Sequence, residues 1–396
     1  EKYAELAPPR GGAPAEGGGP PDVLLNRLLL LQAFPDYLKY PPRLYRLMHV
    51  VNMALNLVGG DKLAWQQRRA ESFTSTPLHS GSLFVGYRRT RDYGGKSGIA
   101  LGTAVAISGA AASSNMGYFS PSPFVTLALT FFNARLGWWL GNPGVHGART
   151  FFRSHPKSAL SPILDEAFGQ TDDRNPYVLL SDGGHFENLG LYEMVLRRCR
   201  NIVVVDGSAD PSGALEGLGD AVRKIRIDLG VRIEFDSPFP ILPRPASEEK
   251  GAGGYCAVGD IHYEDVDAAP GGRVDAPGRE HARHEMTGRI VYVKPTIYGT
   301  EPRDIYNYAM SHPDFPHETT ADQFFDEPQF ESHRMLGYYI LEQLFEEAAH
   351  GPGGVDYSEG RDLQKFVTWL DERGEAERGA AGGKKKDGET IAGGTG

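Results

Sequence analysis

The sequence has little of what builds disulfide frameworks or zinc sites. Only two of its 396 residues are cysteine, Cys199 and Cys256, and neither belongs to a zinc-type spacing. Such sparing use of cysteine fits a reducing compartment. We therefore expect a cytoplasmic protein, with peripheral attachment to a membrane as the alternative, that needs no metal ion and no other cofactor.

Long hydrophobic runs are missing as well. The nearest is the segment 124–140, whose mainly apolar part stops at Phe132 and is too short to span a bilayer. Trp138 and Trp139 follow it and are of the type that lies at bilayer interfaces, although a buried helix with two packed tryptophans is the simpler interpretation. No basic-then-apolar signal peptide opens the chain.

Positive charge is in deficit. Lysine and arginine number 41 against 51 aspartates and glutamates, which leaves a formal net charge of −10. Nonspecific nucleic-acid binding needs a basic surface, so we expect no nucleic-acid partner. Hydrophobic residues at 40% and charged residues at 23% are ordinary for a globular protein, and the length is sufficient for a substantial core.

Composition divides the chain into three parts. Residues 1–21 are rich in glycine and proline and too poor in apolar residues to fold, and residues 373–396 read as a disordered tail of Glu, Gly, Ala and Lys. Between them, we expect residues 22–372 to form one large domain, although the length also allows two or three smaller ones.

The most informative stretch combines two short apolar runs with a glycine turn. Residues 177–180 form a run long enough for a buried strand, which stops at the turn Asp182-Gly183-Gly184. Asn188 is a candidate N-cap for a following helix, and residues 202–205 form a second buried strand. Strand, helix and strand in this order predict a βαβ unit, and hence a parallel sheet covered by helices.

Two aspartates occupy equivalent positions in the predicted βαβ unit. Asp182 and Asp206 each follow one of the two predicted strands directly. Open α/β sheets place their chemistry at the carboxyl ends of their strands, which makes both aspartates candidates for a site. Of the two, Asp206 fits the anchoring of a loop better than acid–base chemistry.

Hydrophobic periodicity predicts further elements on the C-terminal side. The pattern indicates an amphipathic helix over residues 218–229, a last long helix over 329–349, and strands over 231–235, 255–263 and 289–295, the last two paired around a polar insertion. The N-terminal side gives weaker signals. We expect a helix or strand over 44–58, loops over 59–98, and a helix of small side chains over 102–118.

The glycine turn also carries a resemblance to a known family. Ser181-Asp182-Gly183-Gly184 with Asn188 and the strand before Asp206 resembles the second catalytic motif of patatin-like acyl hydrolases, and residues 201–211 are closer still to the cytosolic phospholipase branch. The resemblance implies a three-layer α/β/α fold with a mostly parallel sheet, incomplete at its N-terminus. It also implies phospholipase or lysophospholipase chemistry, the hydrolysis of an acyl ester at a lipid or membrane surface.

The same resemblance assigns roles to residues. Asp182 takes the role of the base in a Ser–Asp dyad, and Gly183, Gly184 and Asn188 form the active-site turn. In the family, the serine lies on a G-x-S-x-G elbow and a glycine-rich loop supplies the oxyanion donors; this sequence contains no such elbow.

Two serines keep part of the elbow pattern. Ser108 is followed by Gly109 in the small-residue stretch, and Ser97 stands between Lys96 and Gly98. We take Ser108 as the candidate within this chain, with Gly109 lining the site, and Ser97 as the weaker one. Alternatively, the nucleophile lies in an upstream segment or a partner chain, or has been lost.

Three other interpretations stay open. Asp182 can be a carboxylate that only caps a turn, and the missing elbow fits a non-catalytic scaffold or remnant at a membrane surface. A metal-dependent hydrolase is the third, although no H-E-x-x-H spacing occurs. Its candidate ligands are His185 and Glu187 with Asp182 or Asp206, and a second group of His312, His317 and Glu318.

Overall fold

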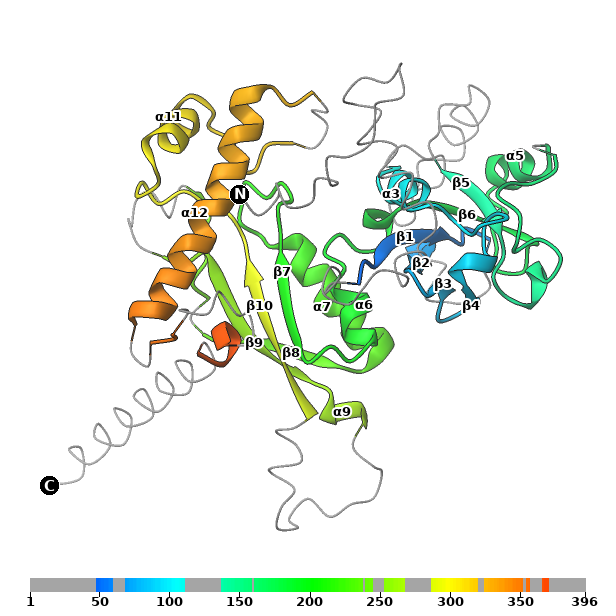
Figure 1. Ribbon diagram of the computed structural model, residues 1–396, viewed down its shortest axis with the longest axis horizontal. Helices are drawn as coiled ribbons and strands as arrows, with labels where there is room; N and C mark the ends of the chain where they lie inside the picture. The colour runs from blue at the N-terminus through cyan, green and yellow to red at the C-terminus, as the bar shows by residue number, and fades with distance from the viewer. Residues whose placement is uncertain are drawn as a thin grey trace, which may run out of the picture. The chain divides into compact units, whose positions relative to one another are not determined.

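A computed structural model of the protein describes residues 48–59, 68–110, 137–158, 160–237, 239–244, 253–267, 286–319, 324–351, 354–356 and 365–369 (Figure 1). The chain divides into two compact units, Glu1–Phe186 and Glu187–Gly396. The segments 1–21 and 373–396, which were predicted to be disordered, lie outside the described residues.

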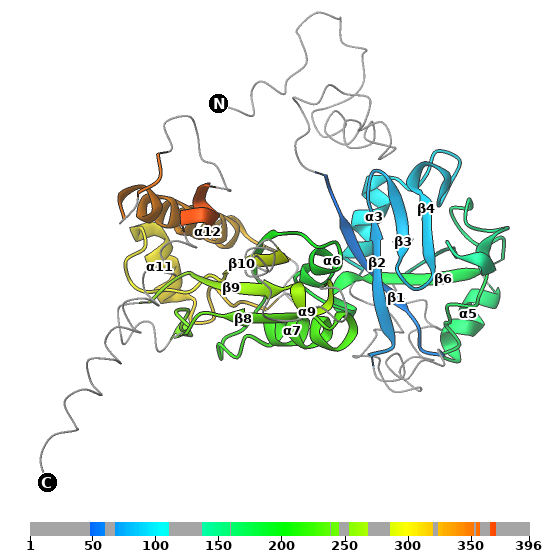
Figure 2. The ribbon, with the colours of Figure 1, turned by 90° about the horizontal axis from the view of Figure 1, so that it is seen from below.

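The first unit is built on a six-stranded sheet in the order β4-β3-β2-β1-β6-β5, and every neighbouring pair in it is antiparallel (Figure 2). Its strands are β1 (Val51–Asn56), β2 (Ala70–Ser75), β3 (His79–Ser82), β4 (Gly86–Arg89), β5 (Trp138–Gly141) and β6 (Tyr177–Asp182). Its helices are α3 (Leu101–Ser108) and α5 (Leu160–Ala167), with short 3-10 turns η3 (Thr90–Asp92), η5 (Val145–Gly147) and η6 (Gly183–His185).

Alternation along the strands places one hydrophobic cluster of this unit on a single face of the sheet. Met53 and Leu55 on β1 lie on the same face as Leu180 on β6, and all three are buried. Ala104 and Ile107 of α3 pack against this cluster. The small side chains of α3 thus let the helix cover the sheet closely, and the end of α3 arrives beside the end of β6.

The second unit carries a four-stranded mixed sheet in the order β7-β10-β9-β8. Only β10 and β7 are parallel, while β9 is antiparallel to both of its neighbours. The strands are β7 (Asn201–Val205), β8 (Arg232–Phe235), β9 (Cys256–His262) and β10 (Thr287–Val293). The helices are α6 (Leu191–Leu196), α7 (Glu216–Leu229), α9 (Glu264–Asp267), α11 (Arg303–Ser311) and α12 (Glu327–His350), and the core includes Val291, Ile305, Phe315, Leu336 and Ile340.

The predicted three-layer α/β/α fold with a mostly parallel sheet is wrong. Its two diagnostic strands belong to different sheets: β6 pairs antiparallel with β1 and β5, whereas β7 pairs with β10. Leu179 and Leu180 point to opposite faces of β6 and are both fully buried. A strand buried on both faces reads as a continuous apolar run, which is typical of parallel sheets, but the run itself carries no strand direction.

The tryptophan pair also differs from its prediction. Trp138 and Trp139 lie on strand β5 rather than at the end of a helix, with Trp139 buried and Trp138 half exposed. The apolar residues 124–132 before them lie outside the described residues. Within the described parts of the chain, no helix has both the length and the apolar character that crossing a membrane requires.

Helix α12 begins at a cap that its sequence specifies. Asp326 accepts a hydrogen bond from the backbone N–H of Gln329 at 2.8 Å, and Pro328 occupies the first turn. Replacing Asp326 by Ala is expected to lower the free energy of unfolding by about 1 kcal/mol. Asp326→Asn should retain most of the stabilisation, because Asn is also a good N-cap residue. Urea denaturation of the three proteins tests this, and an Ala variant as stable as the wild type would exclude the cap.

Candidate functional site

Asp182 stands at the tip of strand β6, where the glycine turn begins. Its Oδ1 accepts a hydrogen bond from the backbone N–H of Gly184 at 2.7 Å, and the residue is half-buried. Its other oxygen, Oδ2, makes no hydrogen bond with any residue that the structure describes. One oxygen therefore fixes the carboxylate, and the other stays available as a hydrogen-bond acceptor.

Gly183 is required at its position by a close approach of strands. A Cβ atom built on it would lie 2.9 Å from the carbonyl oxygen of Asn52 on β1. Any other residue would push β1 and the turn apart, so the glycine is needed for the backbone path that presents Asp182.

Ser108 lies at the same corner of the first unit. It ends α3, and its hydroxyl donates to the carbonyl oxygen of Asn52 at 2.7 Å. Two residues on, the carbonyl oxygen of Ala110 accepts from the backbone N–H of Asp182 at 3.4 Å, and the exposed Gly109 between them is the C-cap of α3. The Ser108 hydroxyl is thus directed to a backbone carbonyl and not to the Asp182 carboxylate.

Two further predicted residues lie at exposed positions outside the helices and strands. Ser97 is exposed in a turn closed by a hydrogen bond from the N–H of Gly98 to the carbonyl oxygen of Gly95. Asn188 does not cap α6, because the N-cap is Gly190 in the left-handed conformation.

Ser181 forms a pair that sequence reasoning missed. Its Oγ lies 2.8 Å from Nδ1 of His185 and accepts a hydrogen bond from the side-chain amide of Asn56, also at 2.8 Å. The hydroxyl and the imidazole lie at the distance found when a serine is paired with a base. Ser181 is completely buried between paired strands, however, and no substrate reaches it. We regard this network as structural.

Asp206 is the centre of a buried polar network in the second unit. Its carboxylate accepts from the backbone N–H and hydroxyl of Ser208 at 2.9 and 2.6 Å and from the Tyr292 hydroxyl at 2.6 Å, and it pairs with Nζ of Lys294 at 3.1 Å. Burial on its own raises the pKa of Asp206, but the hydrogen bonds from Ser208 and Tyr292 and the charge of Lys294 outweigh it and hold this pKa below the ordinary value. With both oxygens engaged, Asp206 anchors the loop after β7.

His317 lies beside this network. Burial and the neighbouring Lys294 charge lower its pKa, so the imidazole is neutral at pH 7. With Lys294, Pro243 and Leu215 among its neighbours, it lines a cavity of about 10 Å³, which is room for about one water molecule.

Neither predicted histidine group forms a metal site. In the described parts of the chain, no three His, Cys, Asp or Glu side chains are placed to hold a metal ion together. The carboxylate of Glu187 instead accepts from the backbone N–H groups of Leu189 and Tyr192, and Glu318 accepts from the Tyr308 hydroxyl and pairs with His333.

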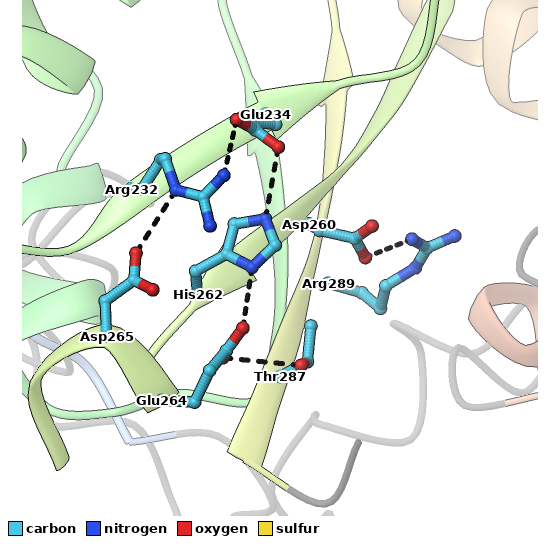
Figure 3. Close-up of polar contacts among 8 residues, drawn as sticks. All are labelled: Arg232, Glu234, Asp260, His262, Glu264, Asp265, Thr287 and Arg289. Atoms are coloured by element: carbon cyan, nitrogen blue, oxygen red, sulfur yellow. Dashed lines mark hydrogen bonds and ion pairs between the residues drawn. The ribbon is translucent and has the colours of Figure 1, made fainter. Parts of the chain in front are cut away.

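A cluster of charged side chains in the second unit surrounds His262 (Figure 3). Its imidazole lies between two carboxylates, with Nδ1 2.7 Å from Glu264 and Nε2 3.5 Å from Glu234. Arg232 bridges Glu234 and Asp265 at 2.7 and 3.2 Å. These partners alternate in charge and most are partly exposed, which is typical of a surface ion-pair network with a modest effect on stability.

A pocket in the first unit was not predicted at all. It has a volume of about 670 Å³ and is lined by basic and aromatic side chains from β3, β4, the loop after β4 and residues 151–152. The sequence feature that could have indicated it is the concentration of four cationic residues between positions 88 and 96. These residues lie in the range 59–98, for which only loops were predicted.

The glycine turn, the corner with Ser108 and the basic pocket are the three features of the first unit that bear on function. Comparison with known proteins adds no family to them: neither a scan against protein-family models nor a search of curated proteins finds a match for this chain.

Proposed function

We propose that this chain supplies the aspartate base of a Ser–Asp pair that hydrolyses an acyl ester of a lipid. The observation that carries the proposal is the carboxylate of Asp182, with Oδ1 held by the Gly184 N–H and Oδ2 free of partners among the described residues. A general base needs a fixed orientation together with an open acceptor for the incoming proton, and this geometry supplies both. Since the proposed substrate is a lipid and cysteines are few, we place the protein in the cytoplasm, peripherally at a membrane surface.

The serine of the pair comes, in this proposal, from outside the described residues, in an upstream segment or a partner chain. Ser108 shares the corner with Asp182, but its hydroxyl is bonded to the carbonyl oxygen of Asn52. It would have to break this bond before it could give its proton to Asp182. Ser108 is therefore the in-chain alternative.

A fluorophosphonate probe, which reacts with activated serines, identifies the nucleophile. The chain is expressed together with the coding region that precedes it, labelled, digested and analysed by mass spectrometry. We expect the label on a serine outside the described residues, and equal labelling of the Ser108→Ala variant. A label on Ser108 would move the nucleophile into the described part of the chain, and the absence of any label would contradict the hydrolase.

A second candidate is a non-catalytic scaffold at a lipid surface. It is favoured by one observation: within the described residues, no serine hydroxyl bonds to Asp182. The same labelling experiment separates the two functions, because a scaffold leaves the probe unreacted with and without the upstream region.

A further inference from the structure

The basic pocket of the first unit is a second candidate site, separate in its residues from Asp182. Its lining residues are His79, Tyr87, Arg88, Arg89, Arg91, Asp92, Gly95, Lys96, Phe151 and Phe152. A volume of about 670 Å³ is within the range of pockets that hold small molecules. The pocket therefore has both the size and a chemically distinctive wall.

Charge is the first of its distinctive features. Four cationic residues, Arg88, Arg89, Arg91 and Lys96, line the pocket together with a single acidic residue, Asp92. The protein as a whole has a net charge of −10, so the sign of charge in the pocket is opposite to that of the protein. A concave surface with one sign of charge concentrates ligands of the opposite sign.

One of these cations is held in place. The Arg88 guanidinium donates from Nε to the carbonyl oxygen of Pro143 at 2.7 Å and lies 4.5 Å from the ring centroid of Phe151. Both contacts leave its charge uncompensated, because neither partner is an anion. Arg88 is thus a fixed positive charge on the wall of the pocket.

Two other cations are free to bind a ligand. The side chains of Arg89 and Lys96 are exposed and form no hydrogen bond or ion pair with any residue that the structure describes. Within the described part of the chain, the only ion pair of Arg91 is with Asp92, at 3.7 Å, and both of these side chains are more than half exposed. The pocket therefore keeps most of its donors unused.

The backbone brings these side chains together. Arg89 lies directly opposite His79 on the edge pair β3–β4, which places both side chains on one face. Lys96 stands at the corner of the turn closed by Gly95 and Gly98, and the N–H of Gly94 donates to the carbonyl oxygen of Phe151 at 2.9 Å. That hydrogen bond holds the loop that carries Lys96 next to the segment that carries Phe151 and Phe152.

We propose that this pocket binds a phosphomonoester whose organic part is apolar or aromatic. A phosphomonoester carries close to two negative charges at pH 7 and three acceptor oxygens, which match several cations better than a single carboxylate does. Guanidinium groups bind such oxygens in pairs. The rings of Phe151 and Phe152, the latter 49% exposed, offer an apolar surface beside the charges.

Two sources share this chemistry, a lipid headgroup and a water-soluble phosphomonoester. Leu83 and Phe84 at the tip of the β3–β4 hairpin are 54% and 40% exposed, and apolar side chains of this kind insert into a bilayer surface. The experiment must therefore offer the phosphate group in both forms.

The test compares the wild-type chain with Arg89→Gln/Lys96→Gln. The matched control is Arg223→Gln/Arg226→Gln on α7, which removes the same charge from exposed positions of the second unit. Phenyl phosphate and inorganic phosphate are titrated by calorimetry. Co-sedimentation uses vesicles of phosphatidylcholine alone and vesicles with equal parts of phosphatidylcholine and phosphatidic acid.

We expect the pocket variant to weaken binding by at least about tenfold in Kd and the control to leave it unchanged. Added salt should weaken the wild type, since exposed charges are screened. Saturable binding of phenyl phosphate identifies a soluble ligand, and binding only to vesicles with phosphatidic acid identifies a lipid headgroup. No binding in either assay, or equal binding by the pocket variant, overturns the proposal and leaves the role of Asp182 untouched.

Discussion

Replacing Asp182 by Asn is expected to lower kcat/KM for hydrolysis of a lysophospholipid ester by about 100- to 10,000-fold, the range that removal of a general base produces. The amide oxygen of Asn can still accept the hydrogen bond from the Gly184 N–H that holds the turn. It cannot take a proton from a serine. The variant therefore separates the chemical role of the carboxylate from its structural role.

The control for this variant is Asp314→Asn. Asp314 is an exposed aspartate in the second unit, and the same isosteric change there should leave turnover unaffected. Thermal unfolding completes the comparison. Asp182→Asn should have the same Tm as the wild type. Asp182→Ala loses the acceptor for the Gly184 N–H and should have a lower Tm. Undiminished hydrolysis by a well-folded Asp182→Asn variant would remove Asp182 from the mechanism.

Replacing Lys294 by Met is expected to lower the free energy of unfolding by about 3–5 kcal/mol, as measured by urea denaturation at pH 7. Lys294 and Asp206 are each 2% exposed, so removing the lysine leaves a buried carboxylate without its counter-ion. The double variant Asp206→Asn/Lys294→Met removes both charges together and should recover part of the loss. A single variant as stable as the wild type would show that the two charges do not interact in the folded protein.

The pH dependence of this effect has a definite sign. The pKa of Asp206 in the folded protein lies below its ordinary value. The ionised carboxylate therefore stabilises the fold fully at pH values above about 3.9, the pKa of an unfolded Asp. This stabilisation is lost as the pH falls through the lower pKa of the folded state. Loss of the Lys294 charge, which lowers the pKa of Asp206, moves this pKa upward from its value in the folded wild type. The stability difference between wild type and Lys294→Met should therefore shrink as the pH falls and Asp206 becomes protonated in the variant.

Much of the second unit could be predicted from periodicity. Helices α7 and α12, strand β8 and the antiparallel pair β9–β10 all form where the pattern indicated them. These elements have one apolar and one polar side, and such a pattern specifies both the type of element and its buried face. The sequence did not indicate the parallel pairing of β7 with β10 or the antiparallel pairing of β8 with β9.

The sheet of the first unit was missed for a physical reason. Strand β2 has the sequence Ala-Glu-Ser-Phe-Thr-Ser and β3 has His-Ser-Gly-Ser, so both are rich in small polar residues, yet nearly all their residues are buried. Their hydroxyl groups satisfy one another: Ser80 lies 2.8 Å from Ser75 and 2.9 Å from Thr90. Hydrogen bonding between side chains on neighbouring strands leaves no periodic signal, and the sequence therefore did not indicate the antiparallel partners of β6.

For the candidate sites too, one part could be predicted from the sequence and another could not. The Asp182 turn was found because a strand and two consecutive glycines are local in sequence. The basic pocket was not found, because Lys96 meets Phe151 only through the fold of residues more than fifty positions apart. Local chemistry could be predicted, and chemistry assembled by tertiary contacts could not.

The central claim is that Asp182 activates a serine, and the rate of fluorophosphonate labelling measures this activation most directly. The wild-type chain and Asp182→Asn, each expressed with its upstream region, are compared at equal probe concentration. The proposed pair predicts labelling of one serine that slows by at least about 100-fold in the variant. Labelling of that serine at the same rate in both proteins would contradict the role assigned to Asp182.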